Sequence, residues 1–175
     1  MNKPNKYLSS LLNLGMLIIL VGASSCAHTQ EPQGLAFEVI ESSSYAAGQT
    51  CIEKEPDLFI IATPEEANAL DLNEQLGGLD YQRNFAAAVC RGRLTVTNPS
   101  LNPEVRQVAR YGNKVVLQVH LKDFETVLRN EGSAQGGSSP YQLIAVSKKG
   151  RWQQEIHFVL EVDGKEVKER SHFIP

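Results

Sequence analysis

The 175-residue sequence predicts an α+β domain, mainly an antiparallel β-sheet or small sandwich of about seven or eight strands with one clear helix near residues 64–76. Two observations favour strands: apolar and polar residues alternate with a period of two over 115–122 and 156–162, and Asp163-Gly164, a strong hairpin-turn signal, follows the second segment. A third observation, a helix-start signal at Thr63, adds the helix.

Short apolar segments define the other strands. The run Phe85 to Cys90 is apolar without interruption, which is typical of a strand buried on both faces or of a sheet lying under a helix. The remaining candidates begin or end at turn-forming residues and occupy 37–40, 58–62, 141–146 and 167–173.

The helix begins at a recognisable cap. Thr63 is placed to cap the N-terminus of the helix, Pro64 fits the first helical position, and Glu66 completes a capping box. Ala67 and Leu70 give the helix an apolar face, and Gly77-Gly78 ends the segment.

Residues 130–139 contain three glycines and three serines. This composition predicts a flexible connector, because it offers little apolar surface for packing. A phosphate-binding loop is disfavoured, since no Lys-Ser/Thr pair follows the glycines.

The N-terminus predicts export. Lys3 and Lys6 precede an apolar run over 11–21, which as a helix would span about 16 Å, too short to cross a membrane. Residues 1–25 therefore read as a signal peptide. The small residues of Ala23-Ser24-Ser25-Cys26 resemble the lipobox of bacterial lipoproteins, with Ala23 where Leu, Val or Ile is usual. The alternative is an ordinary secretory signal.

The lipobox resemblance implies that Cys26 is acylated and becomes the first residue of the mature chain. Residues 26–34 would then form a short polar tether, and 35–175 a single β-rich domain. Ala27 after the cysteine favours the outer membrane, if the cell has one. Loss of Lys3 and Lys6 leaves 15 basic against 20 acidic residues, a formal charge of −5. Membrane attachment would therefore depend on the acyl chains, and a nucleic-acid partner is not expected.

Cys51 and Cys90 remain as a pair in an oxidising compartment, which predicts a disulfide bond. The alternative is two separate buried thiols.

Catalytic motifs are absent from the sequence, so an enzyme is not expected, and no metal or cofactor is indicated. There is no G-x-S-x-G elbow, and the four histidines show no metal-ligand spacing. His28 falls in the tether, His120 and His157 lie on apparent solvent faces of strands, and His172 is near the C-terminus.

The remaining binding candidates are aromatic residues and a neighbouring arginine. Trp152 beside Arg151 is suited to stacking on a sugar or aryl ligand, and Tyr141 is a weaker candidate. Core packing or a strand-edge anchor is the alternative role of Trp152.

Three segments of the chain resemble the PrcB-type exported lipoproteins: Leu79-Asp80-Tyr81, then 85–92, and the strand 139–146 that begins Ser-Pro-Tyr. The similarity covers 58–149. It departs from the family at 93–99, where a Thr-Gly-Gly-Tyr turn is expected. The resemblance implies a non-catalytic accessory subunit that binds and stabilises an exported protease complex. Two other functions stay open from the residues alone: binding of a small ligand or glycan, and an enzyme with a dispersed active site.

Overall fold

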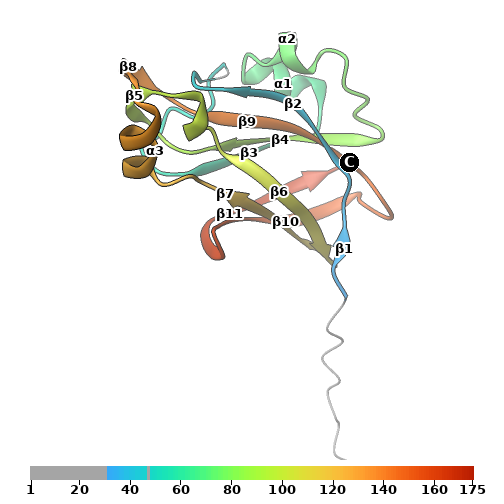
Figure 1. Ribbon diagram of the computed structural model, residues 1–175. Coiled ribbons are helices and arrows are strands. Elements are labelled where there is room, and N and C mark those ends of the chain that lie inside the picture. The colour runs from blue at the N-terminus through green and yellow to red at the C-terminus, as the bar shows by residue number, and fades with distance from the viewer. Residues whose placement is uncertain (1–30, 47) are drawn as a thin grey trace, which may run out of the picture.

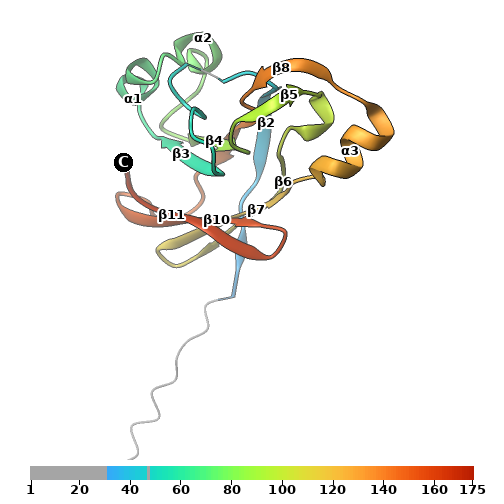
Figure 2. The same cartoon turned by 90° about the vertical axis from the view of Figure 1, so that its left-hand side faces the viewer.

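The computed structural model describes residues 31–46 and 48–175, and the expected signal peptide and Cys26 lie outside them (Figure 1). Two β-sheets pack face to face, and two short helices cover the outer face of one sheet (Figure 2). Within the described part of the chain, no helix is long and apolar enough to cross a membrane. The mostly β, α+β character predicted from the sequence is confirmed, but the described residues form eleven strands in three sheets and three α-helices, more than the seven or eight strands and one helix expected.

The sheet beneath the helices is antiparallel throughout and has the order β2 (Phe37–Ser43), β9 (Tyr141–Ser147), β4 (Asn84–Cys90) and β3 (Asp57–Ile61). The second sheet has five strands in the order β1 (Gln33–Gly34), β6 (Glu104–Tyr111), β7 (Lys114–His120), β10 (Gln154–Val162) and β11 (Lys165–Ile174).

One pairing in the second sheet differs from the expected antiparallel arrangement, because β7 and β10 run parallel. After β7 the chain leaves this sheet and contributes one strand to a separate two-stranded sheet and then β9 to the sheet beneath the helices, before it returns as β10. Such a crossover can bring the chain back in its original direction. The turn predicted at Asp163-Gly164 is confirmed: both residues have positive φ, 47° and 81°, and join β10 to β11.

Strand β4 is buried on both faces, as its unbroken apolar run predicts. Phe85, Ala87 and Val89 belong to the core between the sheets, whereas Ala86, Ala88 and Cys90 belong to a second core under the helices. Cys90 forms a disulfide with Cys51, with an S–S distance of 2.01 Å. The bond fastens the β2–β3 connection to the end of β4.

The single helix expected over 64–76 is two helices, α1 (Pro64–Ala69) and α2 (Asn73–Leu76). Asp71 lies between them with a positive φ of 57°, which breaks the helical path. The Thr63 cap is confirmed, because its hydroxyl accepts a hydrogen bond from the Glu66 amide at 3.2 Å. The Glu66 carboxylate accepts from the Ala62 amide instead of closing the box on Thr63.

The prediction of a flexible connector at 130–139 is wrong. Its first residues end helix α3 (Phe124–Glu131), and 134–138 form strand β8 (Ala134–Ser138), which pairs with β5 (Leu94–Thr97). Backbone hydrogen bonds make this ladder, so glycine does not prevent it. The nearby 3₁₀ turn η1 (Pro99–Leu101) is capped by Asn98, whose side chain also donates to the Gly132 carbonyl at 2.7 Å.

An ion pair joins the sheets along one edge. Asp57 on β3 is buried, and Arg170 on β11 donates to both of its carboxylate oxygens at 2.9 and 2.8 Å. Lys168 lies 3.4 Å from the same carboxylate. Burial would raise the pKa of Asp57, but the hydrogen bonds from Arg170 and the Leu58 amide, with the two positive charges, hold it below its ordinary value.

Candidate binding groove

Three adjoining hollows lie at one end of the sandwich. The β9–β10 connection and the C-terminus, which help to line them, lie on the right in Figure 1, away from β5, β8 and α3. Their volumes are about 620, 560 and 520 Å³. The first and second share Gly150, Arg151 and Gln154, and the second and third share Gln82, Gln153 and Pro175. We call the three together the end groove, and its parts the cationic, middle and apolar hollows.

Six parts of the chain meet at this end. The β6–β7 turn, the 148–153 loop between β9 and β10, and the N-terminal segment with Glu31 and Gln33 form much of the cationic and middle hollows. The segment before β4, the start of α1 and the C-terminus complete the apolar hollow. The groove is therefore lined mainly by loops and chain ends next to strands of both sheets. Binding residues commonly occur on such loops.

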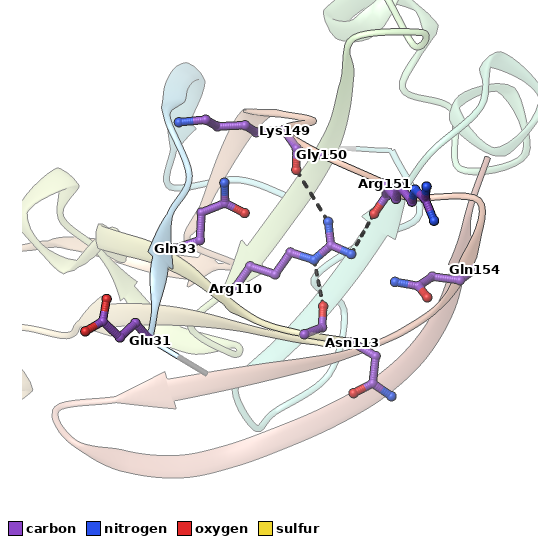
Figure 3. Close-up of a pocket in the computed structure, with 9 residues that line it drawn as sticks. Glu31, Gln33, Arg110, Asn113, Lys149, Gly150, Arg151 and Gln154 are labelled. Atoms are coloured by element: carbon purple, nitrogen blue, oxygen red, sulfur yellow. Dashed lines mark hydrogen bonds between the residues drawn. The ribbon is translucent and has the colours of Figure 1, made fainter. Parts of the chain in front are cut away.

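The cationic hollow carries three positive side chains, Arg110, Lys149 and Arg151, against one carboxylate, Glu31. Lys149 and Arg151 are exposed and lie on either side of the Arg110 guanidinium (Figure 3). Neither forms an ion pair with another described residue. Their charges are therefore available to an anionic group.

Arg110 is buried and fixed by the main chain. Its guanidinium donates to the carbonyls of Gly112 at 2.7 Å, Arg151 at 2.7 Å and Lys149 at 3.5 Å (Figure 3). It also stacks on Trp152, with 4.1 Å from Cζ to the ring centroid. Burial lowers the pKa of Arg110, but a guanidinium still remains charged at neutral pH. Arg110 thus shapes the 149–151 backbone and leaves a positive charge beneath the hollow.

The middle hollow is lined by amide side chains, those of Gln82, Gln153 and Gln154, all exposed. Trp152 also lines it, and the buried indole Nε1 has no hydrogen-bond partner among the described residues. Lys148 fixes the border of this hollow, because its Nζ donates to the carbonyls of Tyr81 at 2.7 Å and Pro175 at 3.1 Å.

The apolar hollow lies between the start of α1 and the C-terminus. Pro64, Tyr81 and Pro175 supply its apolar surface, and Ala62, which also borders it, is fully buried. The buried Tyr81 hydroxyl has no partner among the described residues. Burial and the nearby Glu66 charge raise the pKa of Tyr81, so this hydroxyl stays protonated at neutral pH.

The structure separates the predicted binding residues. Arg151 lines the groove with an exposed side chain, whereas Trp152 is only 5% exposed and belongs to the core between the sheets. Arg110 and Phe85 contact the indole ring, the latter with centroids 5.4 Å apart, so stacking of Trp152 on a sugar or aryl ligand is excluded in this conformation.

Tyr141 is also unsuited to the predicted binding role. It is 1% exposed in the core beneath the helices, and burial together with a hydrogen bond to Glu41 raises its pKa above the ordinary value. The sequence did not indicate Arg110 or the three glutamines, because β6 was not predicted and exposed amides have no characteristic spacing.

The three histidines in the described residues do not share a polar partner, so their side chains form no common site. His120 Nδ1 lies 2.6 Å from Asp163, His157 Nδ1 2.8 Å from the Ser171 hydroxyl, and His172 Nε2 3.1 Å from Glu66. Within residues 31–46 and 48–175, no group of three or more His, Cys, Asp or Glu side chains is arranged to hold a metal ion.

Comparison with known proteins finds no matching family model, no matching curated protein and no matching solved structure.

Proposed function

We propose that this protein is a non-catalytic accessory lipoprotein of the cell envelope, which binds an exported protein through the end groove. The observation that carries the proposal is the groove itself, an extended series of three hollows whose lining combines unpaired cations, amides and apolar surface. Small-molecule sites usually enclose most of their ligand, whereas this lining consists largely of exposed residues. Such an open groove is better suited to a segment of a larger partner.

The predicted export agrees with the chemistry of the domain. A Cys51–Cys90 disulfide is stable in the oxidising compartment to which the N-terminal signal would direct the chain. Acylation at Cys26 would hold the domain close to a membrane, because only four residues separate Cys26 from Glu31 in the cationic hollow. A partner at this groove would therefore be another envelope protein.

The PrcB-type resemblance suggests the nature of that partner. It extends from β3 to β9 and contains α1, α2 and α3, so it includes Tyr81 and Gln82 of the groove. We infer on this basis that the partner belongs to an exported protease complex, which this protein stabilises.

Chemical crosslinking in intact cells, followed by identification of the crosslinked proteins, tests the proposal. Wild type is compared with the groove variant Lys149→Glu/Arg151→Glu and with Arg129→Glu/Lys165→Glu, which makes the same charge change at exposed positions away from the groove. One envelope protein should be recovered with wild type and the control, and at least tenfold less with the groove variant. Equal recovery with all three chains would contradict binding through the groove.

A second comparison tests whether the action is catalytic. Replacing His120, His157 and His172 together with Gln keeps hydrogen-bonding side chains but removes imidazole chemistry. The variant should retain both partner capture and its biological effect. A folded variant that captures the partner but loses the effect would require an enzyme instead.

A further inference from the structure

We infer that the end groove binds an extended peptide segment of the partner and places a carboxylate of that segment against Lys149 and Arg151. This inference rests on the proposed function and adds the chemistry and direction of the bound segment. The carboxylate would lie in the cationic hollow, the peptide backbone along the middle hollow, and an apolar side chain in the apolar hollow.

Charge determines the first contact. The whole chain has a formal charge of −3, yet the cationic hollow has three positive side chains against one carboxylate. Lys149 and Arg151 have no ion-pair partner among the described residues, so a ligand carboxylate would not have to displace an internal one. Arg110 adds a fixed charge behind them, held by three carbonyls before any ligand arrives.

The middle hollow matches a peptide backbone. Each of Gln82, Gln153 and Gln154 offers an N–H donor and a carbonyl acceptor, and successive peptide groups present the same two functions. Trp152 borders the same hollow, but its indole Nε1 is buried, so the contacts to a peptide backbone would come from the exposed amides.

The apolar hollow favours a peptide over a glycan. Pro64, Pro175 and the partly exposed Tyr81 provide contacts for an aliphatic side chain. Glycan sites commonly stack a sugar ring on an open aromatic face, but the Trp152 ring in this groove is covered by Arg110 and Phe85. The chemistry of the described groove residues therefore fits a peptide best.

Affinity selection of peptides tests the inference. The full chain, purified from membranes in detergent, is incubated with a pool of random heptapeptides with free C-termini, and separately with the same pool amidated. Bound peptides are identified by mass spectrometry. We expect enrichment from the free-carboxylate pool, with aliphatic residues toward the N-terminal half. Enrichment of Asp- or Glu-containing peptides from the amidated pool would also support the inference and would identify a side-chain carboxylate as the source.

A groove variant and a matched control variant locate the binding. Lys149→Glu/Arg151→Glu should reduce enrichment at least tenfold, because it replaces two positive charges with negative ones. The contacts of Arg110 should remain, since its acceptors are main-chain carbonyls that these substitutions retain. Arg129→Glu/Lys165→Glu should bind like wild type.

Other outcomes would overturn the inference. They are equal enrichment with the groove variant, peptides selected without any carboxylate, or binding of oligogalacturonate or phosphatidylglycerol vesicles in place of peptides. Crosslinking in cells separates this failure from failure of the proposed function. Groove-dependent capture of an envelope protein without peptide selection overturns only the peptide inference, whereas peptide selection without capture overturns only the accessory function.

Discussion

Reduction of the Cys51–Cys90 disulfide should destabilise the domain substantially. The cysteines are 39 residues apart, and closing a loop of this length removes about 13 cal/mol/K of entropy from the unfolded chain, or about 4 kcal/mol at 25 °C. The loop contains β3, α1, α2 and β4. In the unfolded chain the bond therefore restrains the segments that form half of the four-stranded sheet and its helical cover. For a domain of this size, we expect the melting temperature to fall by roughly 8–16 °C.

Thermal melting of the full chain with and without a phosphine reductant measures the effect. The Cys51→Ala/Cys90→Ala variant is the control. It should be slightly less stable than reduced wild type, because it also lacks two buried sulfur atoms, and its melting temperature should not change with reductant. An oxidised protein that melts at the same temperature as the fully reduced one would refute the reasoning. Mass spectrometry of alkylated samples confirms that the reductant has reached the bond.

Three further predictions concern the ion pair, the helix cap and the anchor. Asp57→Asn should lower the free energy of unfolding in urea by about 2 kcal/mol at pH 7. The difference from wild type should shrink below about pH 4, because the folded-state pKa of Asp57 is lowered and its contribution disappears as that carboxylate is protonated. An undiminished difference at pH 2 would contradict this. Thr63→Ala should cost about 1 kcal/mol by the same assay through loss of the cap, whereas Thr63→Ser should be nearly neutral. Cys26→Ser should leave the chain unprocessed or release it from membranes, and a processed variant that resists a carbonate wash would exclude lipid attachment.

Local patterns predicted much of the fold. The apolar run of β4, the Thr63 cap and the Asp163-Gly164 turn each depend on neighbouring residues, and the structure confirms all three. The split between α1 and α2 was missed, because Asp71 adopts a positive φ that residue type alone does not require. The strand β8 was missed because its stability comes from pairing with β5, about 40 residues earlier in the chain.

The groove was harder to predict than the fold. Its residues come from six parts of the chain, and only tertiary structure brings them together. Arg151 was singled out because it adjoins a lone tryptophan, although that tryptophan is itself a core residue. Arg110 gave no sequence signal, since its importance depends on three carbonyls that approach it from the β6–β7 turn and the 149–151 loop.

Site-specific photo-crosslinking in living cells tests most directly whether the end groove binds a protein partner. A photoreactive amino acid is placed at Gln153 in the middle hollow, or at Glu125 on α3, an exposed position away from the groove. After irradiation, position 153 should yield one discrete protein adduct that position 125 does not, and Lys149→Glu/Arg151→Glu in the same chain should reduce it at least tenfold. No adduct at position 153, or the same adduct with equal yield at both positions, would contradict the account.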